Sequence, residues 1–128
     1  MSNKINESLY YSESDEWLEI DQNTGTIGIS DYAQDQLGDI VYVEELQMGK
    51  QVKKGDVITT IESVKAVSDI YTPVSGVIEE VNQKIVDDPA IINQDPYGDG
   101  WIVKIKMNNP QEKDNLMTAK DYAEYHKD

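Results

Sequence analysis

The chain has 128 residues, 38% of them apolar, which suits one compact domain and leaves little room for a second. Its 25 acidic residues face 11 lysines and no arginine, so at a net charge of −14 we expect no binding to nucleic acid or to an anionic membrane. Cysteine is absent, which excludes disulfides, thiolate nucleophiles and Cys-based metal sites. The acidity either keeps the protein soluble or steers it toward basic clefts on partners.

Short strand patterns begin near residue 17 and are separated by turns. A helix is predicted over residues 31–37, because Asp31 and Gln34 form a capping box and Gly38 stands where the helix should stop. Pro89 predicts a one-turn helix over residues 89–93. In chain order the predicted strands are residues 17–20, 24–30, 40–43, 57–63, 66–72, 77–81 and 101–107.

The C-terminal part is predicted to be helical. Asn109 followed by Pro110 gives one start signal, and Thr118 followed by Asp121 gives a second. Three apolar or aromatic side chains are expected to dock this tail on the rest of the domain: Leu116, Tyr122 and Tyr125. Together these elements predict a mainly β fold with short helices, a core over about residues 10–108 and a helical segment over about 109–126.

Few residues offer independent catalytic chemistry. His126, the single histidine, lies near the chain end and is expected to be a frayed, solvated residue. Ser75 lacks the preceding glycine of a nucleophile elbow. No metal site is expected, and a stand-alone enzyme is disfavoured. The N-terminus has no signal-peptide core, so a cytoplasmic protein is the expectation.

Lys65 is the one conspicuous chemical group. It stands alone at a predicted bend, between the small uncharged side chains of Val64 and Ala66. Glu62 and Asp69 place acidic groups on either side for recognition by an enzyme. An exposed hairpin lysine is ordinarily a solvated charge that guards a strand edge. A sterically clear lysine on a rigid turn also meets the needs of a covalent attachment site.

The sequence resembles the H proteins of the glycine cleavage system. ESVKAVSDIYTPVSG at 62–76 is similar to the lipoylation segment of that family, and GISDYAQDQLGDIVYVE at 28–44 is similar to its other hallmark. NQDPYGDGWIVKIK at 93–106 and DEW at 15–17 resemble further family segments. The resemblance covers roughly residues 10–125 and implies a flattened β-barrel sandwich hybrid of the biotinyl/lipoyl type, with a C-terminal helix.

The resemblance also implies a function. Lys65 is expected to carry (R)-lipoate as lipoyl-lysine, with Glu62, Ser63, Val64 and Ala66 as the flanks of the attachment site. The arm is expected to take an aminomethyl group from a pyridoxal-phosphate glycine decarboxylase to an aminomethyltransferase that uses tetrahydrofolate. Dihydrolipoyl dehydrogenase then reoxidises it. Lipoyl-attaching enzymes are further implied partners, and a monomeric, non-catalytic carrier is expected.

In the family the loaded arm folds back into a cleft, which is implied here to involve Ser14, Glu16 and Asp69. The chain departs from the family pattern at Asp15, where His is usual, and at Gln36, where some members have His. Both departures put an imidazole in the pocket in doubt.

Related carriers fit less well. A lipoyl domain of a 2-oxo-acid dehydrogenase typically has Asp where Val64 stands, and a biotin carrier flanks its lysine with Met. A lipoyl donor that passes lipoate to other enzymes remains an alternative function, because the sequence does not separate it from glycine cleavage.

Overall fold

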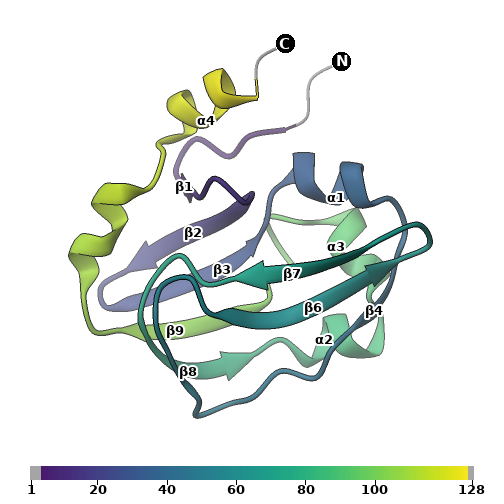
Figure 1. Ribbon diagram of the computed structural model, residues 1–128, viewed down its shortest axis with the longest axis horizontal. Helices are drawn as coiled ribbons and strands as arrows, with labels where there is room; N and C mark the ends of the chain where they lie inside the picture. Colours follow the sequence, from purple (N-terminus) through teal and green to yellow (C-terminus); the bar gives the residue numbers. More distant parts are fainter. Residues whose placement is uncertain (1–3, 127–128) are drawn as a thin grey trace.

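Two antiparallel sheets lie face to face in the computed structural model of the chain, which describes residues 4–126. One sheet has the strand order β1-β2-β3-β9-β8-β5 and the other has the order β4-β6-β7, as Figure 1 shows. Short helices lie at the ends of this sandwich. The architecture confirms the expected mainly β fold, as a flattened sandwich.

Most of the regular structure consists of strands of two to seven residues. The strands are β1 Tyr10–Tyr11, β2 Glu16–Asp21, β3 Thr24–Ile29, β4 Ile40–Val43, β5 Gln51–Val52, β6 Val57–Ser63, β7 Val67–Tyr71, β8 Gly76–Val81 and β9 Val103–Met107. The helices are α1 Asp31–Leu37, α2 Gln83–Asp87, α3 Ala90–Gln94, the 3₁₀ helix η1 Pro110–Asn115 and α4 Ala119–Tyr125.

The main core fills the space between the sheets. Alternation along strand β9 illustrates how the core forms. Val103, Ile105 and Met107 are buried on one face of the strand, while Lys106 is exposed on the other. Ile105 pairs with Gly25 of β3 and with Ile78 of β8, so one side chain contributes to the core at the centre of the larger sheet.

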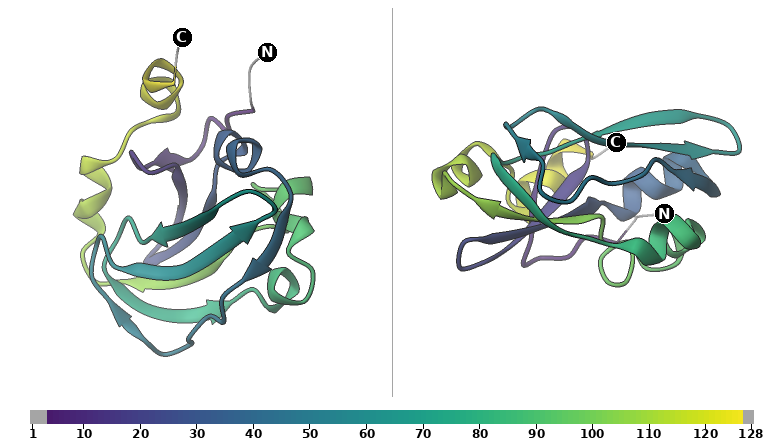
Figure 2. Two further views of the ribbon diagram at one scale, coloured as in Figure 1. Left: turned by 45° about the vertical axis from the view of Figure 1, so that its right-hand side comes forward. Right: turned by 90° about the horizontal axis from the view of Figure 1, so that it is seen from below.

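A second apolar cluster joins the C-terminal helix to the other face of β2. Its buried members are Leu9, Tyr11, Trp17, Ala119 and Tyr122. The rings of Tyr11 and Tyr122 stack with their centroids 4.2 Å apart. Trp17 lies over Gly28, where a Cβ would come within 2.6 Å of the indole. Figure 2 shows α4 set apart from the sandwich, beside the N-terminal segment.

Helix α1 has the predicted bounds but a different cap. Ser30 precedes the helix, and its Oγ accepts a hydrogen bond from the Ala33 N–H at 3.1 Å. The Gln34 side chain instead donates to Asp31 Oδ1 at 2.8 Å. The predicted capping box at Asp31 was therefore wrong, because Asp31 is already inside the helix.

Strands β2, β3, β7 and β8 differ from the prediction by one residue at one or both ends, and β9 and α3 begin later than predicted. Strand β9 begins at Val103, since the Trp101 N–H donates to the Gly98 carbonyl at 3.2 Å and so belongs to the preceding loop. Helix α3 begins at Ala90, with Pro89 as the residue before it. The elements β1, β5 and α2 were not predicted.

Strands β6 and β7 form a long hairpin that carries Lys65 at its bend. The hairpin reaches one end of the molecule, beyond the helices beside it, in Figure 1 and in the right-hand view of Figure 2. Cross-strand pairs run from Val57↔Tyr71 to Glu62↔Val67.

Candidate functional site

The bend of the β6–β7 hairpin, residues 63–66, is named here the Lys65 tip. Ser63 holds it together: its N–H donates to the Ala66 carbonyl at 2.8 Å, and its Oγ accepts from the Ala66 N–H at 3.0 Å. The Val64 N–H donates to the carbonyl of Asp39 at 3.0 Å, which ties the tip to the start of β4. The backbone that presents Lys65 is therefore fixed, although the side chains of Val64, Lys65 and Ala66 are exposed.

The Lys65 side chain lies against Gly38. A Cβ built on Gly38 would come within 3.4 Å of Lys65 Cε, and Gly38 has a φ of 76° that disfavours other residues. Within residues 4–126 the Lys65 ammonium has neither a hydrogen bond nor an ion pair. The amine is therefore accessible, while its aliphatic stem runs beside a flat stretch of backbone.

Asn93 of α3 fixes the segment under the Lys65 stem. Its side-chain amide donates to the Gly38 carbonyl at 2.8 Å and to Gln34 Oε1 at 2.9 Å, and its Oδ1 accepts from the Ile40 N–H at 2.9 Å. The sequence alone did not predict this role. The available signal was the pair of amide residues, Asn93 and Gln94, that ends the otherwise apolar helix AIINQ.

The surface around the tip combines acidic and apolar side chains. Tyr42, Glu62 and Val67 form one cross-strand row, in which Tyr42 is 50% exposed and Val67 is 68% exposed. Val64 adds a further exposed apolar side chain. Exposed apolar groups at a projecting bend are typical of a contact surface for another molecule.

A cleft of about 310 Å³ lies at the other end of β7 and is named here the Glu16 cleft. Its walls include Ser12, Ser14, Glu16, Lys54, Tyr71 and Leu116. Glu16 itself is only 1% exposed. Its Oε1 accepts from the Ser12 and Ser14 hydroxyls at 2.5 and 2.6 Å, and its Oε2 accepts from the Tyr71 N–H at 3.1 Å.

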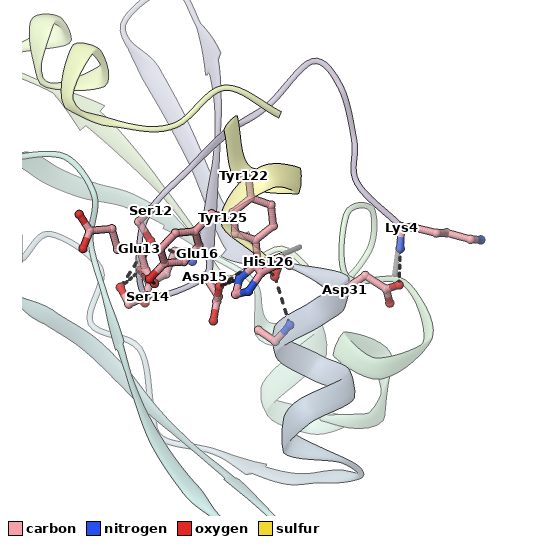
Figure 3. Close-up of polar contacts among 12 residues, drawn as sticks. Lys4, Ser12, Glu13, Ser14, Asp15, Glu16, Asp31, Tyr122, Tyr125 and His126 are labelled. Atoms are coloured by element: carbon pink, nitrogen blue, oxygen red, sulfur yellow. Dashed lines mark hydrogen bonds and ion pairs between the residues drawn. The ribbon is translucent and has the colours of Figure 1, made fainter. Parts of the chain in front are cut away.

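Burial raises the pKa of Glu16 above its ordinary value, and the hydrogen bonds from Ser12, Ser14 and Tyr71 oppose that rise. Because its acceptor atoms are already occupied, the carboxylate primarily joins the start of β2 to the edge of β7. Figure 3 shows the two serines converging on it.

The three residues expected at an arm cleft do not all lie together. Ser14 and Glu16 share the Glu16 cleft, whereas Asp69 is exposed on the outer face of β7 and is not among the residues that line the cleft. The Thr60 hydroxyl donates to Asp69 Oδ1 at 2.9 Å. The other expected flanks, Glu62, Ser63, Val64 and Ala66, lie at or beside the Lys65 tip.

His126 contradicts the expectation of a frayed tail residue. Its Nε2 lies 2.6 Å from Asp15 Oδ1, and its ring stacks on Tyr32 with a centroid separation of 3.7 Å. The Tyr122 hydroxyl also donates to Asp15 Oδ1, at 2.9 Å (Figure 3). An imidazole therefore reaches Asp15 from His126, the residue that follows α4.

Comparison with known proteins assigns the chain to a family. The family described as glycine cleavage H-protein matches residues 9–128. The chain belongs to the glycine cleavage H-protein family. The resemblance seen in the sequence is therefore confirmed.

Curated H-protein relatives are similar over nearly the whole chain. A probable glycine cleavage system H protein of Pyrococcus abyssi is 52% identical over 124 residues, covering 95% of this chain and 92% of the relative. One from Aeropyrum pernix is 49% identical over 120 residues, covering 94% and 84%. The crystal structure of a glycine cleavage system H protein from Mycobacterium marinum matches with a TM-score of 0.85 and 36% identity, covering 94% of this chain and 97% of that one.

Two further findings concern the described residues as a whole. Within residues 4–126, no helix has the length and apolar character needed to cross a membrane. In the same range, no group of three or more His, Asp or Glu side chains is arranged to hold a metal ion.

Proposed function

We propose that this chain is the lipoyl carrier of a glycine cleavage system, with (R)-lipoate attached as an amide to Lys65. The observation that carries the proposal is the accessible, unpaired amine on a fixed hairpin bend in a member of the H-protein family. The β6–β7 bend that carries Lys65 lies at one end of the molecule, where an enzyme can enclose it (Figure 1).

The residues at the tip fit a covalently attached acyl arm. Val64 and Ala66 are small neighbours, and the absence of a Cβ on Gly38 leaves room beside the Lys65 stem. A lipoyl group supplies a dithiolane that accepts a carbon unit together with two electrons, chemistry that a chain without cysteine lacks. The chain's own contribution is to fix the attachment point and expose it.

The protein would act as a carrier, not as a catalyst. It would pass the aminomethyl group from glycine decarboxylase to aminomethyltransferase and electrons to dihydrolipoyl dehydrogenase, in the cytoplasm and as a monomer. The exposed row of Tyr42, Glu62 and Val67 offers these enzymes a surface beside the arm.

We also propose that the outer face of β7 guides a folded arm toward the Glu16 cleft. An extended lipoyl-lysine arm reaches on the order of 15 Å from the backbone. Four residues of strand cover about 13 Å and six cover about 20 Å, so an extended arm passes Asp69 and ends about 5 Å short of Tyr71 at the rim of the cleft. Asp69 is then the exposed contact along the path of the arm, Ser14 is an exposed residue of the cleft toward which the arm points, and the buried Glu16 supports the cleft wall.

Replacing Lys65 tests the carrier function directly. Lys65→Arg should keep the fold, because the side chain is exposed and makes no hydrogen bond or ion pair within the described residues, but should abolish lipoylation and glycine cleavage in a reconstituted system. Lys84→Arg, on the exposed surface of α2, is the matched control and should retain both. Glycine cleavage by the Lys65→Arg protein at the control rate would contradict the proposal.

A further inference from the structure

Strand β7 is an edge strand next to the proposed attachment point. In the smaller sheet the order is β4-β6-β7, so β7 pairs with β6 on one side only. Its first residue, Val67, lies two positions after Lys65 in the chain. An edge strand presents unpaired backbone groups that another strand can bond.

The pairing register identifies which backbone groups face outward. The Ser63 N–H donates to the Ala66 carbonyl and the Ala66 N–H donates to the Ser63 Oγ, so the backbone groups of Ser63 and Ala66 face each other as in a hydrogen-bonded pair. In an antiparallel ladder such pairs alternate with pairs whose backbone groups point away from each other. The next pair, Glu62↔Val67, is therefore of the second kind, and so is Thr60↔Asp69. The N–H and C=O groups of Val67 and Asp69 thus point to the free edge.

Two observations support this assignment. The Thr60 carbonyl accepts from the Glu44 N–H at 2.9 Å, so the backbone of Thr60 faces β4 and not Asp69. The Tyr71 N–H, two residues after Asp69, faces the free edge and donates to the Glu16 carboxylate at 3.1 Å. The edge is therefore closed by Glu16 at Tyr71 and open at Val67 and Asp69.

The side chains along the open part indicate what kind of strand fits. Val67 offers an exposed apolar side chain, flanked by the carboxylates of Glu62 on the paired strand and Asp69 on its own strand. A second copy of this chain would bring like charges together, which disfavours self-pairing. A strand with an apolar residue between basic ones would be complementary to this edge.

We propose that β7 is the docking edge for an extended, basic strand of the enzyme that attaches the acyl arm to Lys65. The inference rests on the proposed function, because it assumes that Lys65 is modified. Main-chain pairing at Val67 and Asp69 sets Lys65 at a fixed distance from the enzyme's strand. It also explains how one lysine among 11 is selected, since register, and not side-chain chemistry alone, marks the position.

Amide hydrogen exchange tests the pairing without any substitution. The unmodified chain is measured alone and with the attaching enzyme in the absence of lipoate. The amides of Val67 and Asp69 should exchange fast in the free chain and slowly in the complex, whereas the Tyr71 amide should be protected in both. A complex that leaves Val67 and Asp69 unprotected, or protection in the chain alone that grows with its concentration, would overturn the proposal.

Two substitutions at Asp69 distinguish the role of its backbone N–H from the role of its side chain. Asp69→Ala removes the carboxylate and the bond from Thr60, and Asp69→Pro removes the outward N–H as well, while the β6–β7 ladder keeps its bonds. Loss of one interface hydrogen bond should make kcat/KM for lipoylation about tenfold lower for Asp69→Pro than for Asp69→Ala. Thermal unfolding of both variants checks the fold.

The outcomes distinguish this inference from the function on which it rests. Equal lipoylation of the two folded Asp69 variants, with normal modification of the wild type, would contradict only the docking edge. A wild-type chain that the attaching enzyme never modifies would contradict the carrier function itself.

Discussion

At the scale of single residues, Glu16 shows how a buried carboxylate serves the fold. Its side chain lies on the same face of β2 as Leu18, where the two sheets meet, and it is buried. Three hydrogen bonds hold the carboxylate, one of them from the edge of β7. The residue therefore couples two strands that belong to different sheets.

The raised pKa of Glu16 predicts a pH effect on stability. The folded state binds the Glu16 proton more tightly than the unfolded state does. The contribution of Glu16 to the free energy of unfolding is therefore greatest below its ordinary pKa of 4.5, and it is lost as the pH rises through the pKa of the folded state. Glu16→Gln can keep the serine bonds and should lose this part of the pH dependence. Denaturant unfolding from pH 4 upward checks it.

Glu19→Gln, at an exposed position of the same strand, is the control and should preserve the wild-type pH profile. If Glu16→Gln and wild type keep the same slope of unfolding free energy against pH, burial of Glu16 does not control its titration.

At the scale of elements, local sequence patterns predicted helices and strands well. Elements that depend on contacts between distant segments could not be predicted from those patterns. Helix α1 and strands β4 and β6 have the predicted bounds, since turns and alternation define them locally. Strand β5 was missed because its two residues are strand only through pairing with Val77 and Gly76 of β8.

The candidate site shows the same difference between residues that local sequence identifies and residues whose role depends on long-range contacts. Lys65 could be singled out because its neighbours in sequence leave it isolated, and its role stays a proposal. The supports given by Asn93 and Gly38 depend on contacts between α1, α3 and the hairpin, which no local pattern reveals. His126 was wrongly placed because nearness to the chain end suggested fraying, whereas its partners Asp15 and Tyr32 come from distant segments.

Docking of α4 gives a prediction at this scale. His126→Ala removes the contact to Asp15 and the stack on Tyr32, and should lower the free energy of unfolding by about 1–2 kcal/mol. Amide exchange should show the largest loss of protection within α4. Lys120→Ala, on the exposed face of the same helix, should leave both measurements near wild type. Unchanged protection of α4 in His126→Ala would show that Tyr122 and its aromatic neighbours hold the helix alone.

At the scale of the whole molecule, a net charge of −14 surrounds a fold with one projecting end. Glu62 and Asp69 place exposed carboxylates beside the proposed attachment point. An acidic field of this kind accelerates encounter with basic clefts and weakens as salt screens it.

Salt dependence separates steering from solubility. If the charge steers docking, association with the attaching enzyme should slow as ionic strength rises from about 0.01 M to about 1 M, where the Debye length falls from about 30 Å to about 3 Å. Stopped-flow measurement of the association rate checks this. A rate that does not change with salt would assign the acidity to solubility alone.

The most direct test of the central claim is the mass of the protein purified from its native cells. The account predicts an intact mass increased by one lipoyl amide, with the modification confined to the peptide that contains Lys65. A fully unmodified protein from cells that cleave glycine, or a lipoyl group on any other lysine, would contradict it.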